Sequence, residues 1–160
     1  MKSDGHVIVG IDPGITGAAV ALNSDGEIIG HIDFDFYQHK LEKFFEDLTY
    51  TFRKIWAVAI ERVSCNGRNG SLANWKLSAS YHTWLTVLAL GGYRTLTPLP
   101  TEWKKGIVRP TDGTDNKKAA LAVARRLWAN SDLFRREKDH NRADAALIGW
   151  WAYLQFMEGK

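Results

Sequence analysis

The stretch HVIVGIDPGITGAAVALNSDGEIIGHIDF, residues 6–34, decides the fold of this 160-residue chain. It holds three short runs rich in β-branched and small apolar residues, at 6–12, 17–23 and 27–34. The second and third runs are joined by Ser24-Asp25-Gly26, and an Asp-Gly pair between apolar runs is a strong hairpin signal. The opening therefore predicts three antiparallel strands.

Helices and strands alternate in the rest of the chain. Apolar residues at three- and four-residue spacing predict an amphipathic helix over 38–54, and the apolar run WAVAIE at 56–61 is typical of a buried central strand. The further expected elements are a helix over 72–90 that stops at Gly91-Gly92, a strand over 93–97 with a Pro-marked loop after it, a helix over 115–129 with Asp115 as N-cap, and a last helix from about 139–141. This order predicts an α/β fold, a mixed β-sheet flanked by α-helices.

The composition is that of a globular protein. Hydrophobic residues make up 45% of the chain and charged residues 24%, which argues against disorder. No apolar run approaches the roughly 20 residues that cross a bilayer, and the amino terminus lacks the apolar core of a signal peptide. The single cysteine, Cys65, excludes an internal disulfide and a multi-cysteine zinc site. We therefore expect an intracellular, reducing setting without a membrane partner.

Charge is divided unevenly along the chain. The net charge of +3 is the balance of −5 over residues 1–61 and +8 over residues 62–160. Residues 101–126 alone carry a net +4 and contain the basic residues Lys104, Lys105, Arg109, Lys117, Lys118, Arg125 and Arg126. This asymmetry suggests a polyanionic partner for the basic part, although a solvated surface explains the same charges.

Three acidic residues stand where a sheet of this kind binds ligands. Asp12 follows the apolar run VIVGI and Glu61 follows WAVAI, and open α/β sheets bind ligands at the carboxyl ends of their strands. Asp144 lies in the Ala-rich segment RADAAL, whose small side chains let a helix approach the sheet. Each acid alone is compatible with an ordinary loop or helix-end position. Together they form an all-oxygen ligand set for Mg²⁺ or Mn²⁺, and a pair of such ions about 3.5–4 Å apart can hydrolyse a phosphodiester.

The turn DPGITG at 12–17 allows a second interpretation. It resembles the first phosphate loop of the actin, Hsp70 and sugar-kinase ATPases, which share a ribonuclease H-like core. Those enzymes need two such lobes around ATP, and 160 residues cannot supply both. We therefore expect no nucleotide cofactor, and an ATPase lobe stays a minor alternative.

Three motifs together carry a family resemblance. GIDPGITGAAVAL at 10–22, AIERV at 59–63 and DHNRADAALIGWW at 139–151 resemble the RuvC-type Holliday junction resolvases, in particular their compact bacteriophage branch. The likeness runs from about residue 6 to residue 155. It implies a ribonuclease H-like fold, a homodimer, and metal-dependent paired nicks in four-way DNA junctions during DNA recombination and repair.

The resemblance also implies site residues. Asp12, Glu61 and Asp144 match the metal-binding catalytic acids of the family, which commonly has an Asp or His three residues before the last acid. Here that position is Asn141, which we interpret as a helix N-cap. His140 lies four residues before Asp144 and shares its helix face. We therefore name His140 as a fourth catalytic residue that assists the water or the leaving group, with a capping-region histidine as the alternative.

Basic residues provide the expected DNA contacts. The resemblance implies that four lysines contact the DNA backbone: Lys104, Lys105, Lys117 and Lys118. A further contact is expected from Arg68, which lies in the Gly/Asn loop after Glu61. Phosphate contacts supply most non-specific affinity and weaken with salt. The aromatic residues of the next helix either stack on unpaired bases or pack in a core or dimer interface; they are Trp75, Tyr81 and Trp84.

The sequence thus predicts a homodimeric, Mg²⁺-dependent endodeoxyribonuclease that resolves branched DNA, with two ions in each site and Mn²⁺ able to substitute. A dimer is expected because two symmetric nicks need two active sites related by a two-fold axis. We expect one domain over residues 1–160, in the cytoplasm of a bacterial or phage-infected cell. Two alternatives stay open: a broader nuclease acting on flaps, forks or RNA–DNA hybrids, and a DNA-binding module without catalysis.

Overall fold

The computed structural model describes residues 5–52, 54–64, 67, 70–113 and 115–158, so Cys65 and the DNA-binding candidate Arg68 lie outside the described residues. The strands are β1 (His6–Asp12), β2 (Ala18–Leu22), β3 (Ile28–Asp33), β4 (Lys54–Ile60) and β5 (Thr95–Leu96). The α-helices are α1 (Gln38–Phe52), α2 (Ser71–Leu90), α3 (Pro100–Lys104), α4 (Asn116–Leu127) and α5 (His140–Glu158). Three short 3₁₀ turns complete the order: η1 (Pro110–Asp112), η2 (Asp132–Phe134) and η3 (Glu137–Asp139). None of the helices in the described ranges is long and apolar enough to cross a bilayer.

The strands form one mixed sheet in the order β3-β2-β1-β4-β5. β2 pairs antiparallel with β1 and β3, whereas β4 pairs parallel with β1 and β5. The expected hairpin is present, and Gly26 adopts a φ of +77°, which glycine accommodates without steric cost. The predicted α/β fold with a mixed sheet is therefore confirmed.

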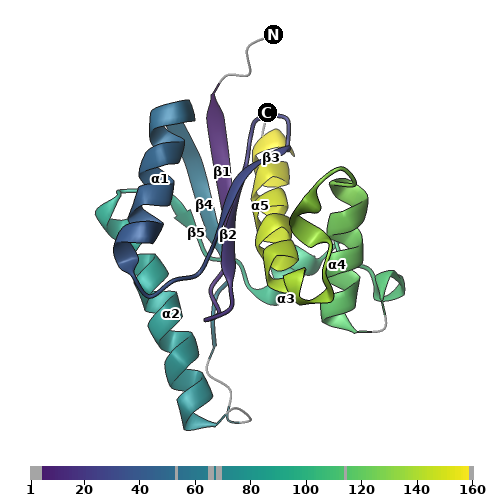
Figure 1. Ribbon diagram of the computed structural model, residues 1–160. Coiled ribbons are helices and arrows are strands. Elements are labelled where there is room, and N and C mark those ends of the chain that lie inside the picture. Colours follow the sequence, from purple (N-terminus) through teal and green to yellow (C-terminus); the bar gives the residue numbers. More distant parts are fainter. Residues whose placement is uncertain (1–4, 53, 65–66, 68–69, 114, 159–160) are drawn as a thin grey trace.

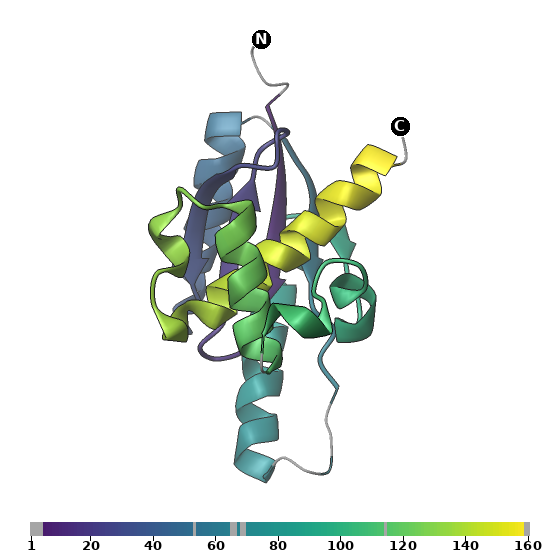
Figure 2. The ribbon, with the colours of Figure 1, turned by 90° about the vertical axis from the view of Figure 1, so that its right-hand side faces the viewer.

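Helices cover both faces of the sheet (Figure 1). α1 and α2 lie on one face, and α3, α4 and α5 lie on the other. The alternation of side chains along β1 explains this layering, because Val7, Val9 and Ile11 join the core on the α1–α2 side while Ile8 packs with α5 residues. Seen from the side, α5 crosses directly over the sheet (Figure 2).

Two glycines let α5 lie against β1. A Cβ on Gly10 would stand 2.1 Å from the carbonyl oxygen of Ala145 and 2.2 Å from the amide nitrogen of Gly149. No side chain fits there, so the helix backbone rests directly on the strand. This contact places the first turns of α5, which carry Asp144, beside the carboxyl end of β1.

Helix α2 extends beyond the edge of the sheet at which β1 and β4 end (Figures 1 and 2). Its buried residues begin at Ser80, and Leu72 and Trp75 before it are 64% and 65% exposed. The first half of this helix therefore presents large apolar side chains to solvent.

One helix was missing from the sequence interpretation, which assigned a Pro-marked loop to the region of α3. Pro100 occupies the start of this helix, and the amide of Leu99 donates a 2.6 Å hydrogen bond to Glu102 Oε2. Five residues are too few for a hydrophobic period to be visible. The N-cap at Asp115 is confirmed, because its side chain accepts a 2.9 Å hydrogen bond from the amide of Lys118.

Candidate active site

The three acidic residues meet at one edge of the sheet. Asp12 is the last residue of β1, and Glu61 directly follows β4. Since Ile11 is paired with Ile60 in the parallel register, the next residue of each strand lies at the same level, and the amide of Glu61 donates to the carbonyl of Ile11 at 3.2 Å. Asp144 comes from the second turn of α5.

Two of the acids, Asp12 and Asp144, have raised pKa values. Burial, followed by repulsion from Glu61, raises the pKa of Asp12 from 3.8 to about 7. Burial, followed by repulsion from Asp12, raises the pKa of Asp144 from 3.8 to about 8. Lys104 and Lys117 lower both pKa values but do not outweigh burial and repulsion. The cluster is therefore short of positive charge.

The chemistry of the cluster fits a divalent cation. Asp144 Oδ1 is buried and accepts no hydrogen bond from the residues that the structure describes. Carboxylate oxygens are the ligands that Mg²⁺ and Mn²⁺ prefer, and a buried acceptor without a partner is costly. Across the described ranges, no three His, Cys, Asp or Glu side chains are already arranged to hold one ion together. The donor set thus has the right chemistry for a metal, without a preformed cage.

Glu61 has a partner that the sequence interpretation missed. The indole Nε1 of Trp103, in α3, donates a 2.6 Å hydrogen bond to Glu61 Oε2. Trp103 is fully buried. No sequence signal links the two residues, which are 42 positions apart in the chain.

The turn after Asp12 is held on both sides. A Cβ on Gly17 would stand 2.0 Å from the Asp12 carbonyl oxygen, so the turn closes only with glycine there. From α2, the buried hydroxyl of Ser80 donates to the carbonyl of Pro13. From α5, Asn141 Nδ2 donates to the carbonyl and the hydroxyl of Thr16 at 2.7 and 2.8 Å. The N-cap assignment of Asn141 was wrong, because α5 begins at His140 and the Asn141 amide binds this turn instead.

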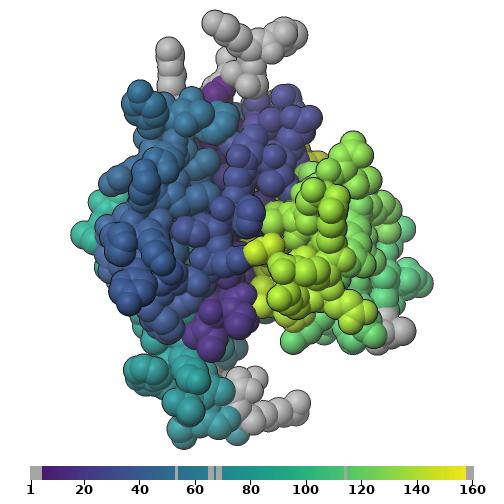
Figure 3. All heavy atoms as spheres, viewed as in Figure 1, coloured from purple at the N-terminus to yellow at the C-terminus, as the bar shows by residue number. Residues whose placement is uncertain are grey.

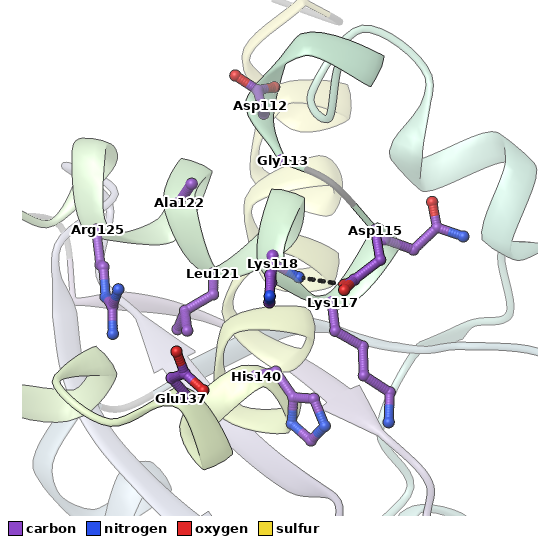
Figure 4. A pocket seen from close by; sticks show the side chains of 11 residues that line it. Asp112, Gly113, Asp115, Lys117, Lys118, Leu121, Ala122, Arg125, Glu137 and His140 are labelled. Carbon is purple, nitrogen blue, oxygen red and sulfur yellow. Dashed lines mark hydrogen bonds between the residues drawn. The ribbon is translucent and has the colours of Figure 1, made fainter.

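His140 lines a cavity of about 780 Å³ whose lining includes none of the three acids. Figure 4 shows it together with Lys117, Lys118 and Arg125 of α4 around this cavity. His140 Nδ1 is buried and has no hydrogen-bond partner within the described part of the chain. The structure therefore brings the candidate fourth residue next to two candidate DNA-binding lysines.

The basic residues of α3 and α4 have different environments. Lys104 and Lys117 act electrostatically on Asp12 and Asp144, so both lie near the acids. Lys105 is exposed at the end of α3. Arg125 donates instead to the carbonyls of Phe134 and Arg135, and Arg126 pairs with Asp112 at 3.1 Å.

Figure 3 shows that the surface is hollowed between α2 and the part of the chain that contains α4, with the β1–β2 turn at the top of the hollow.

The aromatic residues of α2 have different environments. Trp84 is fully buried in the core, and Tyr81 packs partly against that core. Trp75 is 65% exposed. Of these three rings, Trp75 is the one accessible to a partner.

Comparison with known proteins gives three similarities. No family model matches the chain. A segment of 85 residues is 33% identical to the chloroplastic Holliday junction resolvase MOC1 of Chlamydomonas reinhardtii, and this segment is 52% of the present chain and 9% of that protein. Among solved structures, RuvC of Thermus thermophilus in complex with a Holliday junction substrate has a TM-score of 0.66 at 16% identity, covering 95% of this chain and 96% of that one.

A second Thermus thermophilus RuvC structure has a TM-score of 0.63 at 20% identity, covering 95% of this chain and 96% of that one. Both likenesses extend over almost the full length of each chain. The chain therefore has the ribonuclease H-like fold of RuvC.

Proposed function

We propose that this chain is a metal-dependent endodeoxyribonuclease that resolves four-way DNA junctions by paired symmetric nicks. The observation that carries the proposal is the meeting of Asp12, Glu61 and Asp144 at one sheet edge, where burial and repulsion between the acids raise the pKa of Asp12 and Asp144. The similarity to the MOC1 resolvase and the fold shared with junction-bound RuvC support junction DNA as the substrate.

Asp12, Glu61 and Asp144 would hold divalent metal, which we take to be two Mg²⁺ ions with Mn²⁺ able to substitute. When bound, such ions activate a water molecule and neutralise the leaving oxygen of a phosphodiester. Lys104 and Lys117, which already act on Asp12 and Asp144, would attract the scissile phosphate to the site. His140 would accept or return a proton at its imidazole.

DNA binding is assigned to the basic residues around this edge of the sheet. Lys117 and Lys118 line the cavity beside His140, and Lys104 and Lys105 belong to the end of α3. Arg68 stays a candidate on sequence grounds alone. These cations are suited to phosphate contacts, which position the duplex arms without reading sequence.

We propose that the active form is a homodimer of this domain, residues 1–160, in the cytoplasm of a bacterial or phage-infected cell. Paired nicks require two sites related by a two-fold axis. The exposed apolar half of α2, with Leu72 and Trp75, supports an interface between two copies.

The decisive experiment is cleavage of a synthetic four-way junction, mapped to nucleotide resolution, with Mg²⁺ and with EDTA. We expect paired nicks with Mg²⁺, none with EDTA and none with Asp12→Asn. Asp25→Asn is the matched control, since it makes the same change at an exposed hairpin acid far from the cluster. Cleavage by Asp12→Asn at the wild-type rate would refute the site assignment. Equal cleavage of junction, fork and linear duplex in competition would favour the broader nuclease.

A further inference from the structure

We propose that Trp103 is a positioning residue whose indole N–H holds Glu61 in place for metal binding. The inference rests on the proposed function, in which Glu61 is a metal ligand. It concerns how this chain orients that ligand, through a contact 42 residues apart in sequence.

The first support is the geometry of the contact. Trp103 Nε1 lies 2.6 Å from Glu61 Oε2, which is short for a hydrogen bond between a nitrogen donor and a carboxylate. The bond engages one carboxylate oxygen, and no hydrogen bond to the other, Oε1, is found among the described residues. A donor that binds one oxygen restricts the rotation of the carboxylate. Residues that hydrogen-bond to metal ligands commonly orient them in this way.

The second support is the rigidity of the donor. The Trp103 ring has no exposed surface and belongs to a core cluster whose members come from β1, β4, α4 and α5; they include Ile8, Ala59, Val123 and Leu147. A ring packed on all sides cannot turn its N–H elsewhere without opening the core. The N–H is therefore held at one place at the edge of the cluster.

The third support is the connection between the two backbones. The amide of Arg62, the residue after Glu61, donates to the carbonyl of Pro98 at 2.8 Å, just before α3 begins. Glu102 caps the start of this short helix through the Leu99 amide. Both ends of the Trp103–Glu61 contact are thus tied to the same segment, so the contact is not an accident of two mobile side chains.

The chain offers a matched control for the indole N–H. Trp84 is also fully buried, and its Nε1 has no hydrogen-bond partner in the described residues. Trp103→Phe and Trp84→Phe therefore remove the same atoms from two buried rings. Only Trp103→Phe removes a donor from a carboxylate.

The test measures Mn²⁺ binding to the full chain by calorimetry without DNA. We expect Trp103→Phe to weaken Mn²⁺ binding by about 10–100-fold. This is the loss of metal affinity that is typical when a residue hydrogen-bonded to a metal ligand is replaced. Trp84→Phe is expected to stay within about 2-fold of the wild type, because the Trp84 N–H donates to no acceptor among the described residues. Junction affinity in EDTA should be the same in all three proteins, and the cleavage rate at saturating DNA should fall only in Trp103→Phe.

Each other outcome is decisive. Unchanged or tighter Mn²⁺ binding by Trp103→Phe, or an equal loss in Trp84→Phe, overturns the role of Trp103 and leaves the proposed function standing. A wild-type protein that binds no Mn²⁺ refutes the metal site itself and the inference with it. If Trp103→Phe does not fold, the indole N–H resonances of the wild type decide: one must shift on Glu61→Gln and on adding Mg²⁺, and a spectrum in which none moves overturns the inference.

Discussion

Replacing Asp144 with Asn should make the metal-free protein more stable. In the folded protein the pKa of Asp144 is raised to about 8 from 3.8. Between these values the folded state keeps a proton that the unfolded state has released, so the free energy of unfolding falls as the pH rises towards 8. Asparagine has no proton to lose, and its presence also removes a negative charge that acts on Asp12.

The size of the effect follows from the pKa values. Each pH unit between the unfolded and folded pKa values costs about 1.4 kcal/mol, so the wild type loses about 4 kcal/mol between pH 5 and pH 8 through this group. Asp144 keeps some contact with water, which lowers the expected gain of Asp144→Asn at pH 8 to about 2–4 kcal/mol. A domain of this size gains roughly 2–4 °C in Tm per kcal/mol, so we expect an increase of about 5–15 °C.

The assay is thermal unfolding in EDTA at pH 5 and pH 8, followed by circular dichroism. We expect little difference between Asp144→Asn and the wild type at pH 5, and the full difference at pH 8. Adding Mn²⁺ should stabilise the wild type and not the variant, because a ligand at 100 times its Kd contributes about 2.7 kcal/mol. Asp25→Asn should match the wild type throughout. A variant no more stable than the wild type at pH 8, or a gain of equal size at both pH values, would refute this account of the acid cluster.

Three further predictions follow from the structure. His140→Ala should lower kcat for junction cleavage about 100-fold at unchanged junction affinity, as expected for a lost proton-transfer group, and an unchanged kcat would reduce His140 to a capping-region residue. The pair Lys117→Ala and Lys118→Ala should lower the slope of log affinity against log salt by about 2 in filter binding, whereas Lys40→Ala with Lys43→Ala on α1 should leave it unchanged. Gly10→Ala places a Cβ 2.1 Å from the Ala145 carbonyl and should cost about 3 kcal/mol or more in urea unfolding. Gly30→Ala, whose Cβ would meet Phe44 at an ordinary 3.7 Å, is its control, and equal losses would contradict the close packing of α5 on β1.

Local pattern was enough to predict the sheet and the long helices. The runs of β-branched residues around an Asp-Gly turn predict the strands of 6–34, and the spacing of the apolar residues predicts α1. Asp12 and Glu61 could be placed together because parallel strands end at the same edge. Those inferences need only the periodicity of one segment at a time.

Contacts between distant segments could not be predicted in this way. The hydrogen bond from Trp103 to Glu61 depends on a helix of five residues that no periodicity reveals. Asn141 looked like a helix cap because amides are common at that position, but its neighbour in space is Thr16, 125 residues earlier. In both cases tertiary packing decides the partner of a polar group, and the one-dimensional pattern carries no record of it.

The turn at 12–17 also sets a condition on protein engineering. Its backbone is satisfied by Ser80 from the helical layer on one face of the sheet and by Asn141 from the layer on the other. Moving the DPGITG motif into another scaffold would leave two carbonyl groups without donors unless both layers came with it. A graft of the six residues 12–17 alone would therefore not reproduce this turn. The graft would also need the part of α2 that carries Ser80 and the part of α5 that carries Asn141.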